Sequence, residues 1–134
     1  MARVAALIPD LLFGSKVKSA LEAAGHEVDL ITGEVEAWDG IGGTDVLVVD
    51  LTVDDLDGVE LVETLATGGE LHDVRTLGFF AHVEPEVRDR ALAAGFDQVV
   101  PRSRMAREGP ALVDRLAVRS GFSPDERGNE RLDR

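Results

Sequence analysis

The sequence predicts one α/β domain built on a parallel β-sheet. Short apolar runs alternate along the chain with segments whose apolar residues recur at helical spacing. The run at 46–49, VLVV, has no polar alternation, as expected for a strand that is covered on both faces. With 134 residues, 44% of them hydrophobic, the chain is large enough to bury one core.

Strands and helices are expected to alternate in a regular order. The apolar runs predict strands at 4–8, 28–31, 46–49, 77–81 and 98–100. Helical spacing predicts a first helix with an apolar stripe of Val17, Ala20, Leu21 and Ala24, and further helices at 59–67, 85–94 and about 110–119. The glycine-rich stretch 33–44 leaves room only for a brief helix around 35–38.

Glycine and proline indicate where the helices begin and end. Gly25 and Gly95 follow their helices at the position where a left-handed residue commonly closes a helix. Pro85 and Pro110 suit a first helical turn, where proline has no backbone hydrogen bond to lose. These signals support the element boundaries independently of the apolar pattern.

Five strand–helix units with short connections predict a flavodoxin-like, doubly wound sheet. The expected strand order is 2-1-3-4-5, with helices on both faces of the sheet. We expect this domain to span residues 1–120. Residues 121–134 are polar and charged with almost nothing to bury, so we expect a disordered tail.

Charge and composition exclude several classes of function. The chain has 26 acidic and 14 basic residues and a net charge of −12, which repels nucleic acids and anionic membranes. It contains no cysteine, no apolar segment long enough to span a membrane and no cleavable leader pattern, so we expect a cytoplasmic protein. It has no P-loop, dinucleotide-binding glycine motif or nucleophile elbow, and no enzyme activity is expected.

Asp50 is the main candidate functional residue. It ends the third predicted strand and opens an acidic loop that Gly58 closes. In an open parallel sheet, ligands and reacting groups gather just beyond the carboxyl ends of the strands. The same edge should carry residues that follow the other strands, namely Asp10, Phe80, His82, Arg102 and Ser103.

Two stretches of the chain match a known family. They are DLTVDDLDGVELVETL at 50–65 and ALAAGFDQVVPRS at 91–103. Through them, residues 1–120 resemble the CheY-like receiver domain of bacterial response regulators. The resemblance puts Asp50 at the family's phosphoacceptor aspartate and Arg102 at its invariant lysine. It implies a part in two-component signal transduction or a phosphorelay, with a histidine kinase or a downstream effector as partner.

The sequence departs from the family at the metal site. A receiver carries an acidic pair after its first strand, because a small hard cation needs several oxygen ligands. That pair falls here on Ile8 and Pro9, or on Pro9 and Asp10 if the following helix is one residue shorter. An acid is missing in either alignment. We therefore expect Mg²⁺, bound through Asp10 and Asp50, to bind weakly, and we expect no other cofactor.

The switch residues of the family are also replaced. Its Ser/Thr at the end of strand four, which follows the phosphoryl group during switching, is Phe80 here, and its aromatic residue on strand five is Val99. The guanidinium of Arg102 is a larger planar group than the ammonium of a lysine. The resemblance thus implies a divergent receiver with a degraded switch.

Two functions from different classes stay open. The first is a stand-alone, receiver-like signalling module that binds a protein partner, or a second copy of itself, through the face formed by 85–119. The second is a flavodoxin-like domain that holds a small organic ligand or cofactor at the edge lined by Asp10, Asp50, Phe80, His82 and Arg102. The spacing from Asp50 to Gly58 and the place of Arg102 favour the first.

Overall fold

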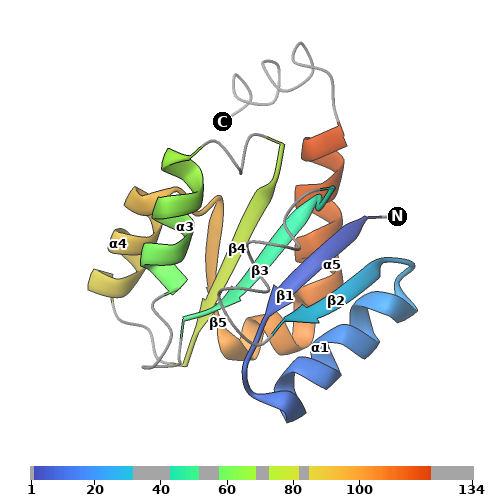
Figure 1. Ribbon diagram of the computed structural model, residues 1–134. Coiled ribbons are helices and arrows are strands. Elements are labelled where there is room, and N and C mark those ends of the chain that lie inside the picture. The colour runs from blue at the N-terminus through green and yellow to red at the C-terminus, as the bar shows by residue number, and fades with distance from the viewer. Residues whose placement is uncertain (1, 32–42, 52–57, 69–72, 82–84, 122–134) are drawn as a thin grey trace.

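The computed structural model has the layered α/β architecture that the sequence predicts (Figure 1). It describes residues 2–31, 43–51, 58–68, 73–81 and 85–121. The strands are β1 (Arg3–Leu7), β2 (Glu27–Ile31), β3 (Val46–Asp50), β4 (Arg75–Phe80) and β5 (Gln98–Pro101). The helices are α1 (Leu11–Ala23), α3 (Gly58–Thr67), α4 (Pro85–Ala94) and α5 (Arg102–Gly121). The brief helix expected around 35–38 and the tail beyond 121 lie outside the described residues.

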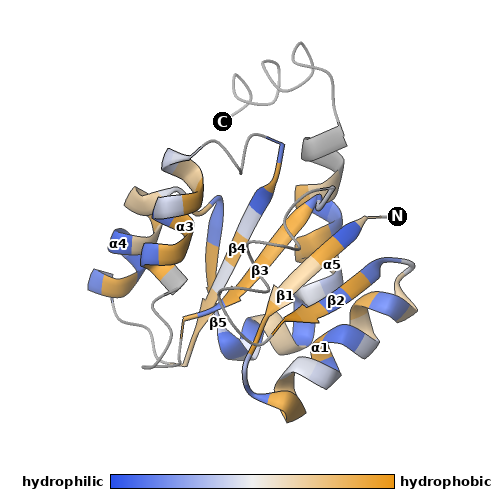
Figure 2. Ribbon diagram, in the orientation of Figure 1, coloured by the Kyte–Doolittle hydropathy of each residue, from blue (hydrophilic) through white to orange (hydrophobic). Residues whose placement is uncertain are grey.

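The five strands form one parallel sheet in the predicted order, β2-β1-β3-β4-β5. Helices α1 and α5 cover one face of the sheet, and α3 and α4 cover the other (Figure 1). Successive residues of a strand point to opposite faces of the sheet. Val48 therefore packs toward α1 and α5, and Val49 packs toward α3 and α4. Burial on both faces explains why β3 is hydrophobic along almost its whole length (Figure 2).

Glycines close α1 and α4 as predicted. Gly25 has a φ of 97° and Gly95 a φ of 121°, in the left-handed region that L side chains rarely adopt. Both glycines turn the chain back from a helix toward the next strand, β2 or β5.

Two helical predictions are wrong in detail. Helix α5 begins at Arg102, so that Pro110 lies inside the helix and does not start it. The segment before Pro110 is held against the core by Met105, which is buried, and this packing overrides the local preference of proline. Ala20 of α1 and Ala24, the C-cap of this helix, are exposed, and the buried stripe contains Phe13, Val17 and Leu21.

Within the part of the chain that the structure describes, no helix combines the length and the apolar character needed to cross a membrane.

Candidate functional site at the carboxyl edge of the sheet

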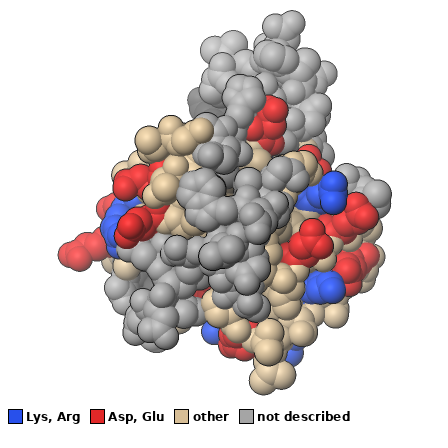
Figure 3. Space-filling view, viewed as in Figure 1, with Lys and Arg blue, Asp and Glu red and all other residues tan. Residues whose placement is uncertain are grey.

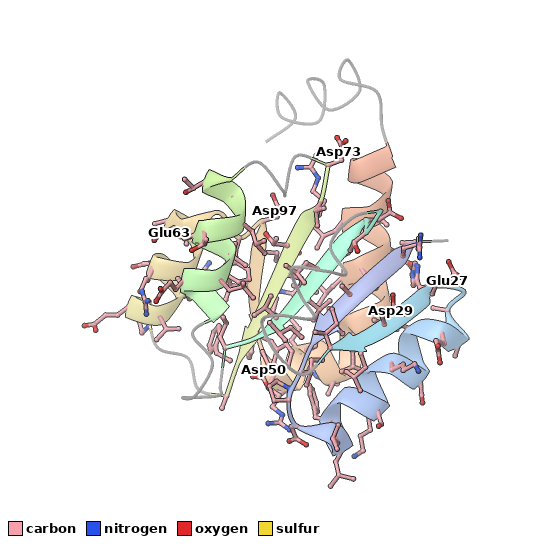
Figure 4. All side chains as sticks on the ribbon, viewed as in Figure 1. Glu27, Asp29, Asp50, Glu63, Asp73 and Asp97 are labelled. Carbon is pink, nitrogen blue, oxygen red and sulfur yellow. The ribbon has the colours of Figure 1, made fainter. Side chains whose placement is uncertain are left out.

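The carboxyl edge of the sheet brings together residues that are distant in the chain. Asp50 ends β3 and Phe80 ends β4. Arg102 begins α5 directly after β5, and Asp10 lies between β1 and α1. Figure 4 shows Asp50 at the end of the sheet opposite to Asp73. The predicted convergence of these residues on one edge is therefore observed.

Asp10 caps α1 and binds Arg102. Its Oδ1 accepts hydrogen bonds from the backbone N–H groups of Leu12, at 3.1 Å, and Phe13, at 3.2 Å. Its Oδ2 accepts a hydrogen bond of 3.0 Å from Nη2 of Arg102. The hydrogen bond from Phe13 and then the one from Arg102 lower the pKa of Asp10 below its ordinary value of 3.8. Both carboxylate oxygens are thus engaged within the protein.

Arg102 also stacks on an aromatic side chain. Its guanidinium carbon lies 4.1 Å from the centroid of the Phe13 ring. That ring in turn contacts Phe79, with ring centroids 5.2 Å apart and an angle of 57° between the planes. Phe79 is fully buried and is the register partner of Asp50 in the sheet. A continuous series of contacts therefore runs from the Asp10–Arg102 pair to the neighbour of Asp50.

Asp50 is fully buried and has an apolar neighbour across the strands. Leu7 of β1 pairs with Val49 of β3, so the next residues, Ile8 and Asp50, come level at the edge. Ile8 is also fully buried, in the core between the sheet and α1 and α5. The residue that follows β1 is therefore apolar and buried.

The other predicted site residues differ in their surroundings. Phe80 is buried at the end of β4. Ser103 is exposed on α5, and its backbone carbonyl accepts a hydrogen bond of 3.4 Å from Nε of Arg107. His82 lies outside the described residues.

The described side chains at this edge do not form a divalent cation site. Mg²⁺ needs several oxygen ligands in a near-octahedral arrangement. Among the described residues, no three acidic or histidine side chains are grouped so that they could hold a metal ion. Ile8 and Pro9 supply no carboxylate, and that of Asp10 already bonds the α1 backbone and Arg102.

Phe13 is the residue of this site that the sequence analysis did not identify. Its helical spacing from Val17 and Leu21 is a signal that could have placed it on the buried stripe of α1. Its contact with Arg102 has no sequence signal, because the two residues meet only when β5 takes its place in the sheet.

No protein-family model and no curated protein sequence match this chain. Solved structures do match it. The receiver domain of the Francisella response regulator 1452 is 21% identical with a TM-score of 0.80, over 90% of this chain and 99% of that one. The signal receiver domain of NarL from Mycobacterium tuberculosis is 23% identical with a TM-score of 0.75, over 87% and 95% of the two chains. The Mn²⁺-bound form of response regulator Rcp1 is 10% identical with a TM-score of 0.72, over 84% and 91%. These similarities confirm that the chain has the fold of a response-regulator receiver domain.

Proposed function

We propose that this chain is a receiver-like signalling module of the cytoplasm that acts by binding a protein partner and has lost the usual phosphorylation switch. The observation that carries the proposal is the engagement of Asp10. This carboxylate is bonded to the α1 backbone and to Arg102, while buried Ile8 lies level with Asp50. Asp50 ends β3, where the resemblance puts the phosphoacceptor, and no acidic cation site surrounds it among the described side chains.

Weak binding of a divalent cation is part of this proposal. Rcp1, which shares the fold, has been solved with Mn²⁺. In this chain Asp50 would be the main carboxylate ligand, because recruiting Asp10 would break its hydrogen bond with Arg102. Fewer charged ligands give a weaker site.

The loss of switching follows from the chemistry of two side chains. Phe80 has no hydroxyl that a phosphoryl group could draw toward itself, and Val99 has no ring that could follow. A ligand shifts a two-state equilibrium only through contacts that differ between the two states. We therefore propose that the face formed by α4, β5 and α5 keeps one conformation, and that partner binding or self-association does not depend on phosphorylation.

A magnesium titration followed by the amide NMR shifts around Asp50 tests the cation site. We expect the wild type to need more than submillimolar Mg²⁺ for saturation and Pro9→Asp, which adds a carboxylate after β1, to bind Mg²⁺ more tightly. If the wild type saturates at submillimolar Mg²⁺ and Pro9→Asp is no tighter, the proposed weakness of the site is wrong.

Beryllofluoride with Mg²⁺, a mimic of the phosphorylated state, tests the switch. We expect amide shifts confined to the neighbourhood of Asp50 and an unchanged sedimentation coefficient. Large shifts along α4 and β5, or a change in oligomeric state, would mean that the domain switches by another route.

A further inference from the structure

Arg102 meets Asp10 across the end of the sheet. Arg102 directly follows β5 and Asp10 lies beyond β1, and the sheet order places β3 and β4 between those two strands. Neighbouring strands of a sheet lie about 4.8 Å apart, which puts the ends of β1 and β5 roughly 14 Å from each other. The hydrogen bond of 3.0 Å between Nη2 of Arg102 and Oδ2 of Asp10 therefore spans the carboxyl ends of β3 and β4.

Asp50 points to the same side of the sheet as this ion pair. Side chains alternate along a strand, and Val48, two residues before Asp50, packs in the layer of α1 and α5. Phe79, the register partner of Asp50, and Ile8 pack in the same layer. The guanidinium of Arg102 and the carboxylate of Asp50 thus share one edge and one face of the sheet. Acidic and basic side chains lie close together at this edge, at the bottom of Figure 3.

Contacts on two sides hold the guanidinium of Arg102 in place. Asp10 binds it through Oδ2, and the centroid of the Phe13 ring lies 4.1 Å from its central carbon. The backbone N–H groups of Leu12 and Phe13 fix Asp10, and the contact with Phe79 fixes the ring of Phe13. The positive charge is therefore positioned before any ligand arrives, so little side-chain entropy remains to be lost.

This arrangement disagrees with a divalent cation site in a specific way. A cation at Asp50 would draw its second side-chain carboxylate from Asp10, the other acid that the sequence predicts for this site. Oδ2 of Asp10 is already bonded to Arg102, and its Oδ1 is bonded to the backbone of α1. A dication that recruited this carboxylate would also face the guanidinium, and like charges raise the cost of binding. Arg102 thus opposes a divalent cation both by holding its ligand and by its own charge.

We propose that Arg102 is the resident cation of the carboxyl edge and competes with divalent cations for Asp10. Phe13 is a positioning residue in this arrangement, because its ring holds the guanidinium at the edge. The inference rests on the proposed function and deepens it: the cation site is weak because a side chain of the protein holds one of its ligands, as well as because an acid is missing. The exclusion is reciprocal, since two cations coupled through one carboxylate weaken each other's binding by the same factor.

Magnesium titrations of matched variants, followed by the amide NMR shifts around Asp50, test the proposal. Arg102→Met keeps most of the packing of the stem but removes the charge and releases Asp10. We expect this variant to bind Mg²⁺ about fivefold more tightly than the wild type. Arg104→Met removes one charge from the same helix and breaks the pair with Glu108, and it should change the affinity by less than about twofold. Adding Asp10→Asn to Arg102→Met should remove most of the gain, because the released carboxylate is then absent.

Substitutions of Phe13 test its positioning role without changing any charge. Phe13→Leu loses the ring beside the guanidinium, and we expect Mg²⁺ to bind about twofold more tightly. Phe13→Tyr keeps the ring and should bind Mg²⁺ as the wild type does. A merely structural role of Phe13 predicts no gain of affinity in Phe13→Leu, so the direction of the change separates the two roles.

The Nε–H NMR signals of the arginines give a test in the unmodified protein. As Mg²⁺ is added, the signal of Arg102 should move because its contact with Asp10 is broken, and the signal of Arg104 should stay in place. An Arg102 signal that stays fixed at saturating Mg²⁺ would overturn the proposal. An affinity of Arg102→Met no higher than that of the wild type, an equal gain in Arg104→Met, or a gain that persists without the carboxylate of Asp10 would do the same.

The two proposals fail separately. If the wild type saturates at submillimolar Mg²⁺ and Arg102→Met binds still more tightly, the proposed weakness of the site is wrong and the competition stands. If the wild type binds Mg²⁺ weakly, Pro9→Asp binds it more tightly and Arg102→Met does not, the competition alone is wrong.

Discussion

Two aspartates at opposite ends of the sheet show how position decides what a carboxylate does. Asp97, just before β5, accepts hydrogen bonds from the N–H of Thr76 at 2.8 Å and from its hydroxyl at 3.3 Å (Figure 4). The N–H of Asp97 donates back to Oγ1 of Thr76 at 3.0 Å. Asp10 also accepts backbone hydrogen bonds, but its second oxygen binds Arg102 from a different βα unit.

The difference lies in burial and in the partner. Thr76 is 1% exposed, so Asp97 satisfies polar groups that water does not reach and joins β4 to β5. The side chains of Asp10 and Arg102 remain 40% and 35% exposed, at the edge where ligands approach an open sheet. Because exposed ion pairs contribute little to stability, residues at this edge can change with function at small cost to the fold.

The largest expected effect comes from removing the carboxylate of Asp97, which accepts hydrogen bonds from the buried Thr76. Asp97→Ala leaves the N–H and hydroxyl of Thr76 without this acceptor, and we expect the free energy of unfolding to fall by about 2–3 kcal/mol in urea denaturation. Asp29→Ala, at an exposed position on β2, is the control and should change it by less than about 0.5 kcal/mol. If the free energy of unfolding fell by a similar amount in both variants, the hydrogen bonds of Asp97 to Thr76 would not contribute more to stability than an exposed carboxylate does.

Phe13→Leu should have the next largest effect. It removes the ring contacts with Phe79 and Arg102 while keeping an apolar side chain, and we expect a loss of about 1–2 kcal/mol of unfolding free energy. Leu12→Ala, at the neighbouring exposed position, is the control, with an expected change below about 0.5 kcal/mol. If Leu12→Ala were as costly as Phe13→Leu, the aromatic contacts would not be what holds this edge.

Arg102→Met should cost less. Methionine keeps most of the packing of the stem but loses the hydrogen bond to Asp10 and the contact of the charge with Phe13, together worth about 1 kcal/mol or less. The difference from wild type should shrink in about 1 M salt, where the screening length is short. Arg104→Met, which breaks only the pair with Glu108, is the comparison and should cost still less. If Arg104→Met lowered the free energy of unfolding more than Arg102→Met, the contacts of Arg102 with Asp10 and Phe13 would not be the more stabilising ones.

The smallest effect is a dependence on pH. The pKa of Asp10 in the fold is lowered from 3.8, so its ionised form stabilises the fold above that value, and this stabilisation is lost as the pH falls through the lowered pKa. Asp10→Asn keeps a side-chain oxygen for the helix cap but no charge. We expect wild type to be more stable than Asp10→Asn at neutral pH and the two to converge in acid well below 3.8. A difference that grows in acid would mean that the charge of Asp10 does not stabilise the fold.

The order of the described strands and helices could be predicted from local signals in the sequence. The unbroken run at 46–49 predicts a strand buried on both faces, and β3 is buried along its whole length. Gly25 and Gly95 predict two helix ends, and both residues have positive φ. These signals are local. The pattern of buried and exposed side chains repeats with the period of a strand or a helix, and a left-handed backbone conformation favours glycine. Parallel strands then place Asp50, Phe80 and Arg102 at one edge, whatever the details of packing.

The roles of the side chains at this edge depend on contacts between elements that are distant in the chain. Pro110 is a plausible helix start by itself, yet α5 begins at Arg102 because the turns before the proline pack Met105 into the core. Asp10 could equally have been a metal ligand or a helix cap. It is a cap that also binds Arg102, because the sheet register brings the start of α5 beside the start of α1. The stacking of Arg102 on Phe13 has the same origin. Contacts between side chains distant in the chain depend on strand register and side-chain direction together, and no short stretch of sequence contains both.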